Sequence, residues 1–158
     1  MGFVRKNFYV SPSKLTALNF AVLAAIGIIF LRTELNLNDY ILIEGGGALT
    51  AIFLASLIFT RHIKQSRMNP EAVDRVVLDG PYSIVRHPYY TGIICMNIAC
   101  IFFFRTPWLI PAVIVFSVLW YREARYEEQA LINKFEVVYL SYMESKGMFF
   151  PKLRKPGT

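Results

Sequence analysis

Charged residues are scarce in this sequence of 158 residues: Asp, Glu, Lys and Arg make up 18% of it, whereas 55% of the residues are hydrophobic. A soluble protein of this length, which suits one domain, would carry more charge. The apolar residues come in long blocks rather than amphipathic stripes, which indicates a membrane protein. The formal charge of +6 could suggest nucleic acid. However, Lys and Arg lie at the ends of the apolar blocks. We therefore expect the protein to associate with a membrane and not with nucleic acid.

Cysteine is also rare. Cys95 and Cys100 lie in one apolar run without metal-ligand spacing, so the sequence predicts neither a disulfide framework nor a metal site. Each is interpreted as a small buried hydrophobic residue. The first apolar block is too long for a signal peptide and lacks a clear small-residue cleavage site.

Four apolar segments predict transmembrane helices: residues 15–31, 41–60, 89–104 and 108–121. The first two would span about 26 and 30 Å as helices, and the last two about 24 and 21 Å, so the second pair either crosses or forms an incomplete hairpin. The C-terminal region is charged but periodic, which predicts an interfacial helix. Its apolar side would carry Leu131, Phe135, Val138 and Tyr142.

The predicted fold is an all-α integral membrane protein with about four transmembrane helices and a C-terminal cytoplasmic or interfacial helical segment. One membrane domain covers residues 1–158. Its parts are N-terminal helices (1–60), a cytoplasmic loop (61–88), a helical hairpin (89–121) and a C-terminal catalytic or interfacial segment (122–158).

Small and polar residues inside the apolar segments have structural explanations. Gly45, Gly46 and Gly47 would let another helix approach closely. Glu44 lies near the end of its segment and is interpreted as reaching the membrane interface, although an intramembrane functional carboxylate is the alternative. Asn97 is explained by a hydrogen bond between helices.

Positive residues predict the orientation. Of the 17 Lys and Arg residues, all but Arg32 and Arg105 lie in the N-terminal segment, the connection 61–86 or the C-terminal segment. The positive-inside rule therefore places both termini and the central connection in the cytoplasm, with multi-pass topology.

Residues 80–92, with the sequence G-P-Y-S-I-V-R-H-P-Y-Y-T-G, form a polar segment between apolar blocks. Pro88 suits the first position of a helix, because its missing N–H would be unpaired there. The helix N-terminus, with Arg86 and His87 beside it, would make a site for an anionic group. The alternative is that Arg86 and His87 only anchor a membrane helix at the headgroups.

A second polar motif follows the hairpin. Whether residues 89–121 cross the membrane twice or form an incomplete hairpin, the chain returns to the face it left, so Glu127 and Glu128 should meet Arg86 and His87 there. Adjacent helical residues point about 100° apart, so we expect only one of the two glutamates to face the site. The other would face Arg122, Arg125 or water.

These motifs resemble those of the isoprenylcysteine carboxyl methyltransferase and phospholipid methyltransferase family. The first is R-H-P-Y-Y-T-G, beginning at Arg86, and the second is E-E-Q-A-L followed by Phe135, Tyr139 and Tyr142. The resemblance covers residues 80 to about 151. Glu136 stands where the family pattern has glycine, which predicts an altered turn or helix there.

The resemblance implies an S-adenosyl-L-methionine-dependent methyltransferase with the cofactor under the C-terminal segment. The implied cofactor contacts are Arg86, His87, Tyr90, Gly92, Glu127 and Glu128. Gly92 would let the adenosyl part approach the backbone closely. No G-x-G-x-x-G follows a strand, which argues against the soluble Rossmann type.

The acceptor is expected to be a lipid or a prenylated molecule in the membrane. A carboxylate acceptor needs charge balance, for which Arg122 or Arg125 is available, and a lipid amine needs Glu128 or a phosphate-bound water to take up its proton. The preferred acceptor is an isoprenylcysteine-type carboxylate, because it needs no base. Phospholipid N-methylation, a membrane reductase with a nicotinamide cofactor and a non-enzymatic scaffold are the alternatives.

Overall fold

The protein, represented by a computed structural model, is described at residues 12–32, 37–62 and 73–152. Four α-helices account for most of these residues: α1 (Pro12–Ile29), α2 (Leu37–His62), α3 (Pro88–Phe104) and α4 (Ile110–Ser145). Two short 3-10 helices, η4 (Gly80–Ser83) and η5 (Pro107–Leu109), precede α3 and α4. No strand occurs within the described residues, which confirms the all-α prediction there.

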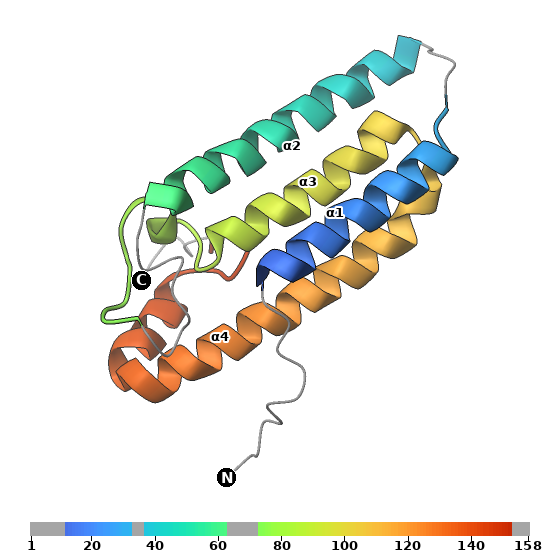
Figure 1. The fold of residues 1–158 in the computed structure, drawn as a ribbon. Coiled ribbons are helices and arrows are strands. Elements are labelled where there is room, and N and C mark those ends of the chain that lie inside the picture. The colour runs from blue at the N-terminus through green and yellow to red at the C-terminus, as the bar shows by residue number, and fades with distance from the viewer. Residues whose placement is uncertain (1–11, 33–36, 63–72, 153–158) are drawn as a thin grey trace.

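The four helices lie side by side (Figure 1). α1 and α3 run in one direction, and α2 and α4 run in the other. α2 packs mainly on α3, and α3 also contacts α1 and α4. Each predicted apolar segment corresponds to a different one of these helices, although segment 15–31 extends two residues past α1 and segment 108–121 begins in η5. The N-terminal end of α3 therefore lies at the same end of the bundle as the C-terminal half of α4.

Glycines permit the close contact between α2 and α3. A Cβ on Gly46 would lie 2.9 Å from a ring carbon of Phe103. A Cβ on Gly92 would lie 2.8 Å from the Cβ of Ser56 and 3.3 Å from the Cα of Phe53. The prediction that the glycines of α2 admit a neighbouring helix is confirmed for Gly46, and the neighbour is α3.

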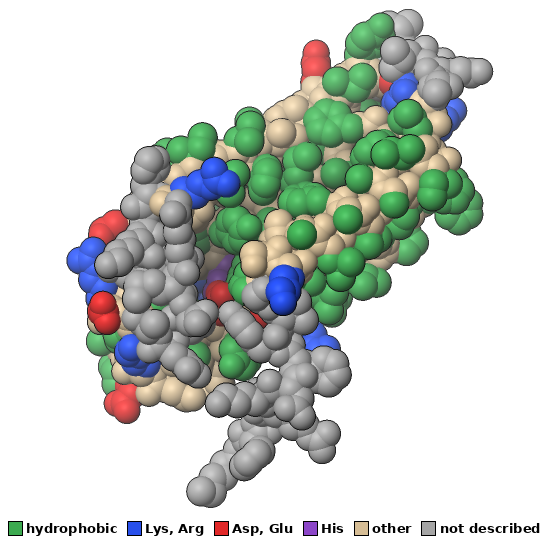
Figure 2. Space-filling view, viewed as in Figure 1, with side chains coloured by type: hydrophobic (Ala, Val, Ile, Leu, Met, Phe, Trp, Pro, Cys, Tyr) green, Lys and Arg blue, Asp and Glu red, His purple; other side chains and the backbone are tan. Residues whose placement is uncertain are grey.

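The outer surface of the bundle is apolar. Large hydrophobic side chains are exposed along α1, α2 and the first half of α4. Figure 2 shows them covering the middle of the molecule, with charged side chains toward its two ends. α1 (Pro12–Ile29) and residues Asp39–Arg61 of α2 are long and apolar enough to cross a membrane. α3 is a shorter apolar helix, so four crossings stay a prediction.

Three buried polar side chains connect α1, α3 and α4. The amides of Asn19 and Asn97 donate to each other's oxygens at 2.7 and 2.9 Å, and the indole N–H of Trp120 donates to Asn19 Oδ1 at 3.2 Å. All three side chains are fully buried. The predicted interhelical hydrogen bond of Asn97 is confirmed, and the paired amides stabilise helix contacts where lipid offers no competing partner.

The fourth apolar segment and the interfacial helix predicted after it are continuous in the structure. They form one helix, α4, which is kinked at Glu136 (φ 42°, ψ −116°). Of the predicted apolar side, Leu131 and Phe135 are half-buried and Tyr142 is buried, but the prediction is wrong at Val138, because the kink changes the helical phase. Val138 is 59% exposed, whereas Tyr139 and Tyr142 are buried.

Replacing Glu136 with glycine should stabilise the protein. A residue with a Cβ is strained at this positive φ by about 1–3 kcal/mol, and glycine returns about 0.4–1 kcal/mol through greater freedom of the unfolded chain, so we expect a net gain of about 1–2 kcal/mol. Thermal unfolding in detergent would measure it. Glu136→Ala is the control, because it removes the exposed carboxylate and keeps the Cβ. An equal gain from alanine would contradict backbone strain as the cause.

The orientation in the membrane stays a prediction. Many of the positive residues behind it lie outside the described residues, in segments 1–11, 63–72 and 153–158. Within the described residues, Glu44 is exposed and lies near the N-terminal end of α2.

Candidate functional site

The first polar motif forms the entrance to α3. Pro88 begins the helix, as predicted. The carbonyl oxygen of His87 accepts hydrogen bonds from the backbone N–H of Thr91 at 2.9 Å and from its hydroxyl at 3.0 Å. These bonds fix the backbone of His87 at the N-terminus of α3, at the end of the bundle.

The chain after α4 is hydrogen-bonded to this entrance. Arg86 N–H donates to the Gly147 carbonyl at 2.9 Å, and His87 N–H donates to the Met148 carbonyl at 3.1 Å. An isolated parallel bridge pairs Val85 with Gly147. A Cβ on Gly147 would clash with the carbonyl oxygen of Phe150, so only glycine fits this turn.

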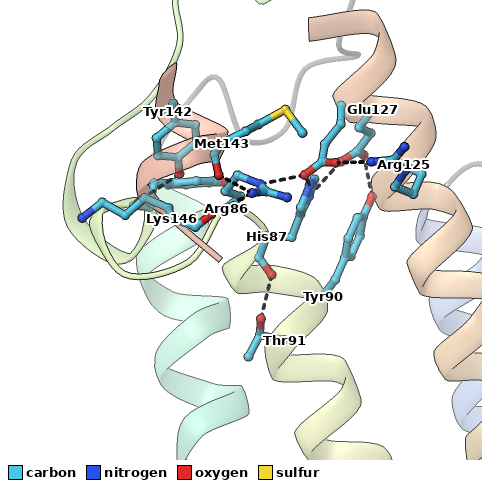
Figure 3. A network of polar contacts seen from close by, with 11 residues as sticks. Arg86, His87, Tyr90, Thr91, Arg125, Glu127, Tyr142, Met143 and Lys146 are labelled. Carbon is cyan, nitrogen blue, oxygen red and sulfur yellow. Dashed lines mark hydrogen bonds and ion pairs between the residues drawn. The ribbon is translucent and has the colours of Figure 1, made fainter. Parts of the chain in front are cut away.

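Arg86 joins the entrance of α3 to both halves of α4 (Figure 3). Its Nε donates to Glu128 Oε1 at 2.8 Å, and Nη1 donates to the carbonyls of Met143 and Lys146 at 3.0 and 2.7 Å. The side chains of Arg86 and Glu128 are only 10% and 1% exposed. A carboxylate of the chain itself thus pairs with Arg86 in this structure, and the predicted role of Arg86 toward an anionic group of a ligand stays a prediction.

His87 lies between two carboxylates. Its Nδ1 is 3.5 Å from Glu127 Oε2, and its Nε2 is 3.3 Å from Glu128 Oε1. The expectation that only one glutamate faces the site is therefore wrong. Adjacent residues of α4 do diverge, but the two imidazole nitrogens lie on different edges of the ring, and each carboxylate reaches one of them.

This arrangement changes the pKa values of the partners. Burial lowers the pKa of His87, but its hydrogen bonds to Glu127 and Glu128 and their charges raise it overall above the usual 6.5. Burial raises the pKa of Glu128, but His87 and Arg86 lower it overall. The pairing thus favours the protonated form of His87 and the ionised form of Glu128 relative to the same groups in water.

Tyr90 extends the cluster along α3. Its hydroxyl donates to Glu127 Oε1 at 2.5 Å, and its ring stacks on that of His87 with the centroids 5.5 Å apart. The Trp120 ring lies 5.0 Å away on the α4 side. Gly92, by contrast, packs against α2: a Cβ built on it would meet atoms of Ser56 and Phe53 in that helix. The structure gives Gly92 a packing role, and its predicted adenosyl contact stays a prediction.

The two arginines of α4 that were predicted to balance the charge of an acceptor, Arg122 and Arg125, lie at the exposed edge of the cluster. Arg125 Nη1 is 3.5 Å from Glu128 Oε2, and its side chain is 55% exposed. Arg122 is exposed as well, and its charge acts on Glu123. Their roles toward an acceptor stay predictions.

Several other residues that the structure uses were not predicted from the sequence. Met143, Lys146 and Gly147 act through backbone atoms or the lack of a side chain, which no side-chain motif reveals. Asn19 carried a usable signal, since it is a polar residue in an apolar run just as Asn97 is. Glu123 also carried one, because it precedes Glu127 by one helical turn.

The cluster has unused hydrogen-bonding capacity. Glu123 Oε2 and Glu128 Oε2 are buried and accept no hydrogen bond. Figure 2 shows a histidine and acidic side chains at the floor of a hollow near the start of α3. Among the described residues, no group of three or more His, Cys, Asp or Glu side chains could hold a metal ion. The arrangement suits a ligand that offers cationic groups or hydroxyls.

Comparison with known proteins identifies a family. The model of the isoprenylcysteine carboxyl methyltransferase (ICMT) family matches residues 40–133, more than half of the chain. Neither a curated protein nor a solved structure matches. The matched range includes nearly all of α2, the whole of α3 and α4 to just before its kink, with Arg86, His87, Glu127 and Glu128. α1 and the chain after the kink lie outside it.

Proposed function

This chain belongs to the isoprenylcysteine carboxyl methyltransferase family, a family of membrane methyltransferases, and we propose that it transfers a methyl group from S-adenosyl-L-methionine to an acceptor embedded in the membrane. The observation that carries the proposal is the cluster of Arg86, His87, Tyr90, Glu127 and Glu128 at one end of an apolar bundle. The two family motifs, far apart in sequence, meet in that cluster.

The residues present suit this cofactor. S-adenosyl-L-methionine has an ammonium group, a sulfonium and ribose hydroxyls, all of which a carboxylate can contact. The buried Glu128 Oε2 lacks a hydrogen-bond donor, and the Tyr90 ring next to His87 offers an aromatic face. The cofactor carboxylate would lie beside Arg86 and His87 at the N-terminus of α3, where both cationic side chains are already held by carboxylates of α4.

The bound cofactor supplies an electrophilic methyl group. The chain's own residues have to bind and align the two reactants, since alignment provides much of the acceleration of a direct displacement. Glu127 and Glu128 are held by His87, Tyr90 and Arg86. The site therefore keeps its geometry before ligands arrive, which lowers the entropic cost of reaching the reactive alignment.

The acceptor is proposed to stay in the bilayer and reach the site from the apolar side of the bundle. We prefer an isoprenylcysteine-type carboxylate, because a carboxylate is already nucleophilic and needs no base. The exposed Arg122 and Arg125 are available to balance its charge. A phospholipid amine is the alternative, for which a carboxylate of α4 would have to take up the proton.

Radiolabelled methyl transfer would test this function. The purified protein would receive labelled S-adenosyl-L-methionine with a farnesyl-cysteine analogue or with phosphatidylethanolamine, and the lipid products would then be treated with mild alkali. We expect label on the farnesyl-cysteine analogue and its release as methanol, because a methyl ester hydrolyses whereas an N-methyl group does not. Stable label on the phospholipid alone would contradict the preferred acceptor and support the N-methyltransferase.

Binding measurements separate the other classes. Calorimetry in detergent should detect S-adenosyl-L-methionine and no binding of NADPH. The opposite result would support a reductase, and binding of neither, with no methyl transfer, would contradict both enzyme functions.

A further inference from the structure

Glu123 is a carboxylate of α4 that the family motifs do not include. Its Oε2 atom is buried and has no hydrogen-bond partner. A buried carboxylate oxygen without a donor is costly, because it has lost water and gained nothing in return. Such an atom in a native site calls for an explanation, and a bound ligand is one.

The position of Glu123 ties it to the site. It lies one helical turn before Glu127, so the two carboxylates share a face of α4. Phe116 and Trp120 lie on the same face and belong to the core cluster that includes Tyr90. Glu123 therefore extends the cluster by one turn from the end of the bundle toward its apolar middle.

The charges around Glu123 indicate which kind of ligand group would stabilise it. Burial raises the pKa of Glu123, the charge of Glu127 raises it further, and Arg122 lowers it. His87 and Tyr90 contact Glu127 and Glu128, whereas Glu123 Oε2 has no hydrogen-bond partner. A positive group between Glu123 and Glu127 would relieve both the desolvation and the repulsion of the two carboxylates.

We propose that Glu123 and Glu127 together form a subsite for a positively charged group of a ligand, on the membrane side of His87. The inference rests on the proposed methyltransferase function. Two ligands of that reaction carry such a group: the cofactor, with its sulfonium and ammonium, and an acceptor with a protonated amine. The sulfonium loses its charge when the methyl group leaves, so a carboxylate beside it would favour the cofactor over its demethylated product.

The test compares Glu123→Gln with the wild type and with Glu144→Gln, an exposed glutamate of the same helix. Calorimetry would give the affinities for S-adenosyl-L-methionine and S-adenosyl-homocysteine, and thermal unfolding would give the midpoint of the unliganded protein. Loss of a charge-assisted contact should weaken binding roughly ten- to a hundredfold. We expect this loss in Glu123→Gln and no change in Glu144→Gln. The midpoint of Glu123→Gln should stay the same or rise, because the substitution removes the charge of a half-buried carboxylate whose Oε2 atom is unpaired and which Glu127 repels.

The pattern of changes in affinity and KM identifies which positively charged group binds at the subsite. A loss confined to S-adenosyl-L-methionine indicates the sulfonium, and an equal loss for both compounds indicates the ammonium. Unchanged cofactor affinity with a raised KM for an amine lipid alone indicates the acceptor. Glu123→Met, which removes the same charge with a side chain of similar length, should reproduce the result.

Two outcomes would overturn the proposal. One is unchanged affinity and unchanged KM in both Glu123 variants. The other is weaker binding together with a lower thermal midpoint in both, which would make Glu123 a structural residue. If the wild-type protein bound neither compound and methylated no acceptor, the proposed function itself would have failed, and the subsite with it.

Discussion

Replacing Arg86 with alanine is expected to lower the free energy of unfolding by about 3–5 kcal/mol, because it leaves the carboxylate of Glu128 buried without its arginine. Glu128 is 1% exposed, and Arg86 is its closest charged partner at 2.8 Å. The same substitution removes the donor to the carbonyls of Met143 and Lys146. Thermal or denaturant unfolding in detergent would measure the loss, and limited proteolysis should cut the C-terminal segment faster.

Arg125→Ala provides a matched control. Arg125 approaches the other oxygen of the same carboxylate at 3.5 Å, but its side chain is 55% exposed. An exposed ion pair contributes about 0–1 kcal/mol, so this variant should unfold almost like the wild type. Equal losses in the two variants would show that burial does not decide the strength of these pairs and would contradict the structural role given to Arg86.

Replacing His87 with glutamine is expected to weaken binding of S-adenosyl-L-methionine roughly ten- to a hundredfold, since one charge-assisted hydrogen bond contributes about 1.5–3 kcal/mol. The imidazole holds Glu127 and Glu128 at 3.5 and 3.3 Å, and glutamine carries no charge with which to hold both. Calorimetry would measure the affinity. Unchanged affinity in a folded His87→Gln protein would remove His87 from the cofactor site.

The same residue predicts a pH dependence. The pKa of His87 is raised in the folded protein above the usual 6.5. Its contribution to stability is therefore complete below pH 6.5 and is lost as the pH rises through the folded-state pKa. Unfolding midpoints measured from pH 6 upward should fall in the wild type, and the part of that fall due to His87 should be missing in His87→Gln. Identical pH profiles would contradict the ion pairs of His87.

The structure also changes which variant tests cofactor binding. From the sequence alone, Glu128→Ala would be a natural choice, as a motif residue with no known structural role. In the structure Glu128 is the buried partner of Arg86 and His87, so its removal would leave Arg86 unpaired and disturb the fold. His87→Gln leaves the contact between Arg86 and Glu128 in place and is the cleaner test.

The sequence by itself determined the helical class, the four apolar segments, the start of α3 at Pro88 and the family. These features depend on local composition and spacing: long apolar runs favour helices in a membrane, and proline suits a first helical turn. The convergence of Arg86 and His87 with Glu127 and Glu128 also followed, because a hairpin returns the chain to the face it left. The glycine position at Glu136 marked the kink in α4.

Only the tertiary structure decided how these residues are used. It places one glutamate against each ring nitrogen of His87. It pairs Arg86 with Glu128 and with two backbone carbonyls after the kink, and it packs Gly92 against α2. Such choices depend on the position of one helix relative to another and on backbone atoms, which carry no residue-specific signal. The buried, unpaired oxygen of Glu123 became visible for the same reason: burial is a property of the packed bundle, because neighbouring segments exclude the water that would otherwise hydrate the carboxylate.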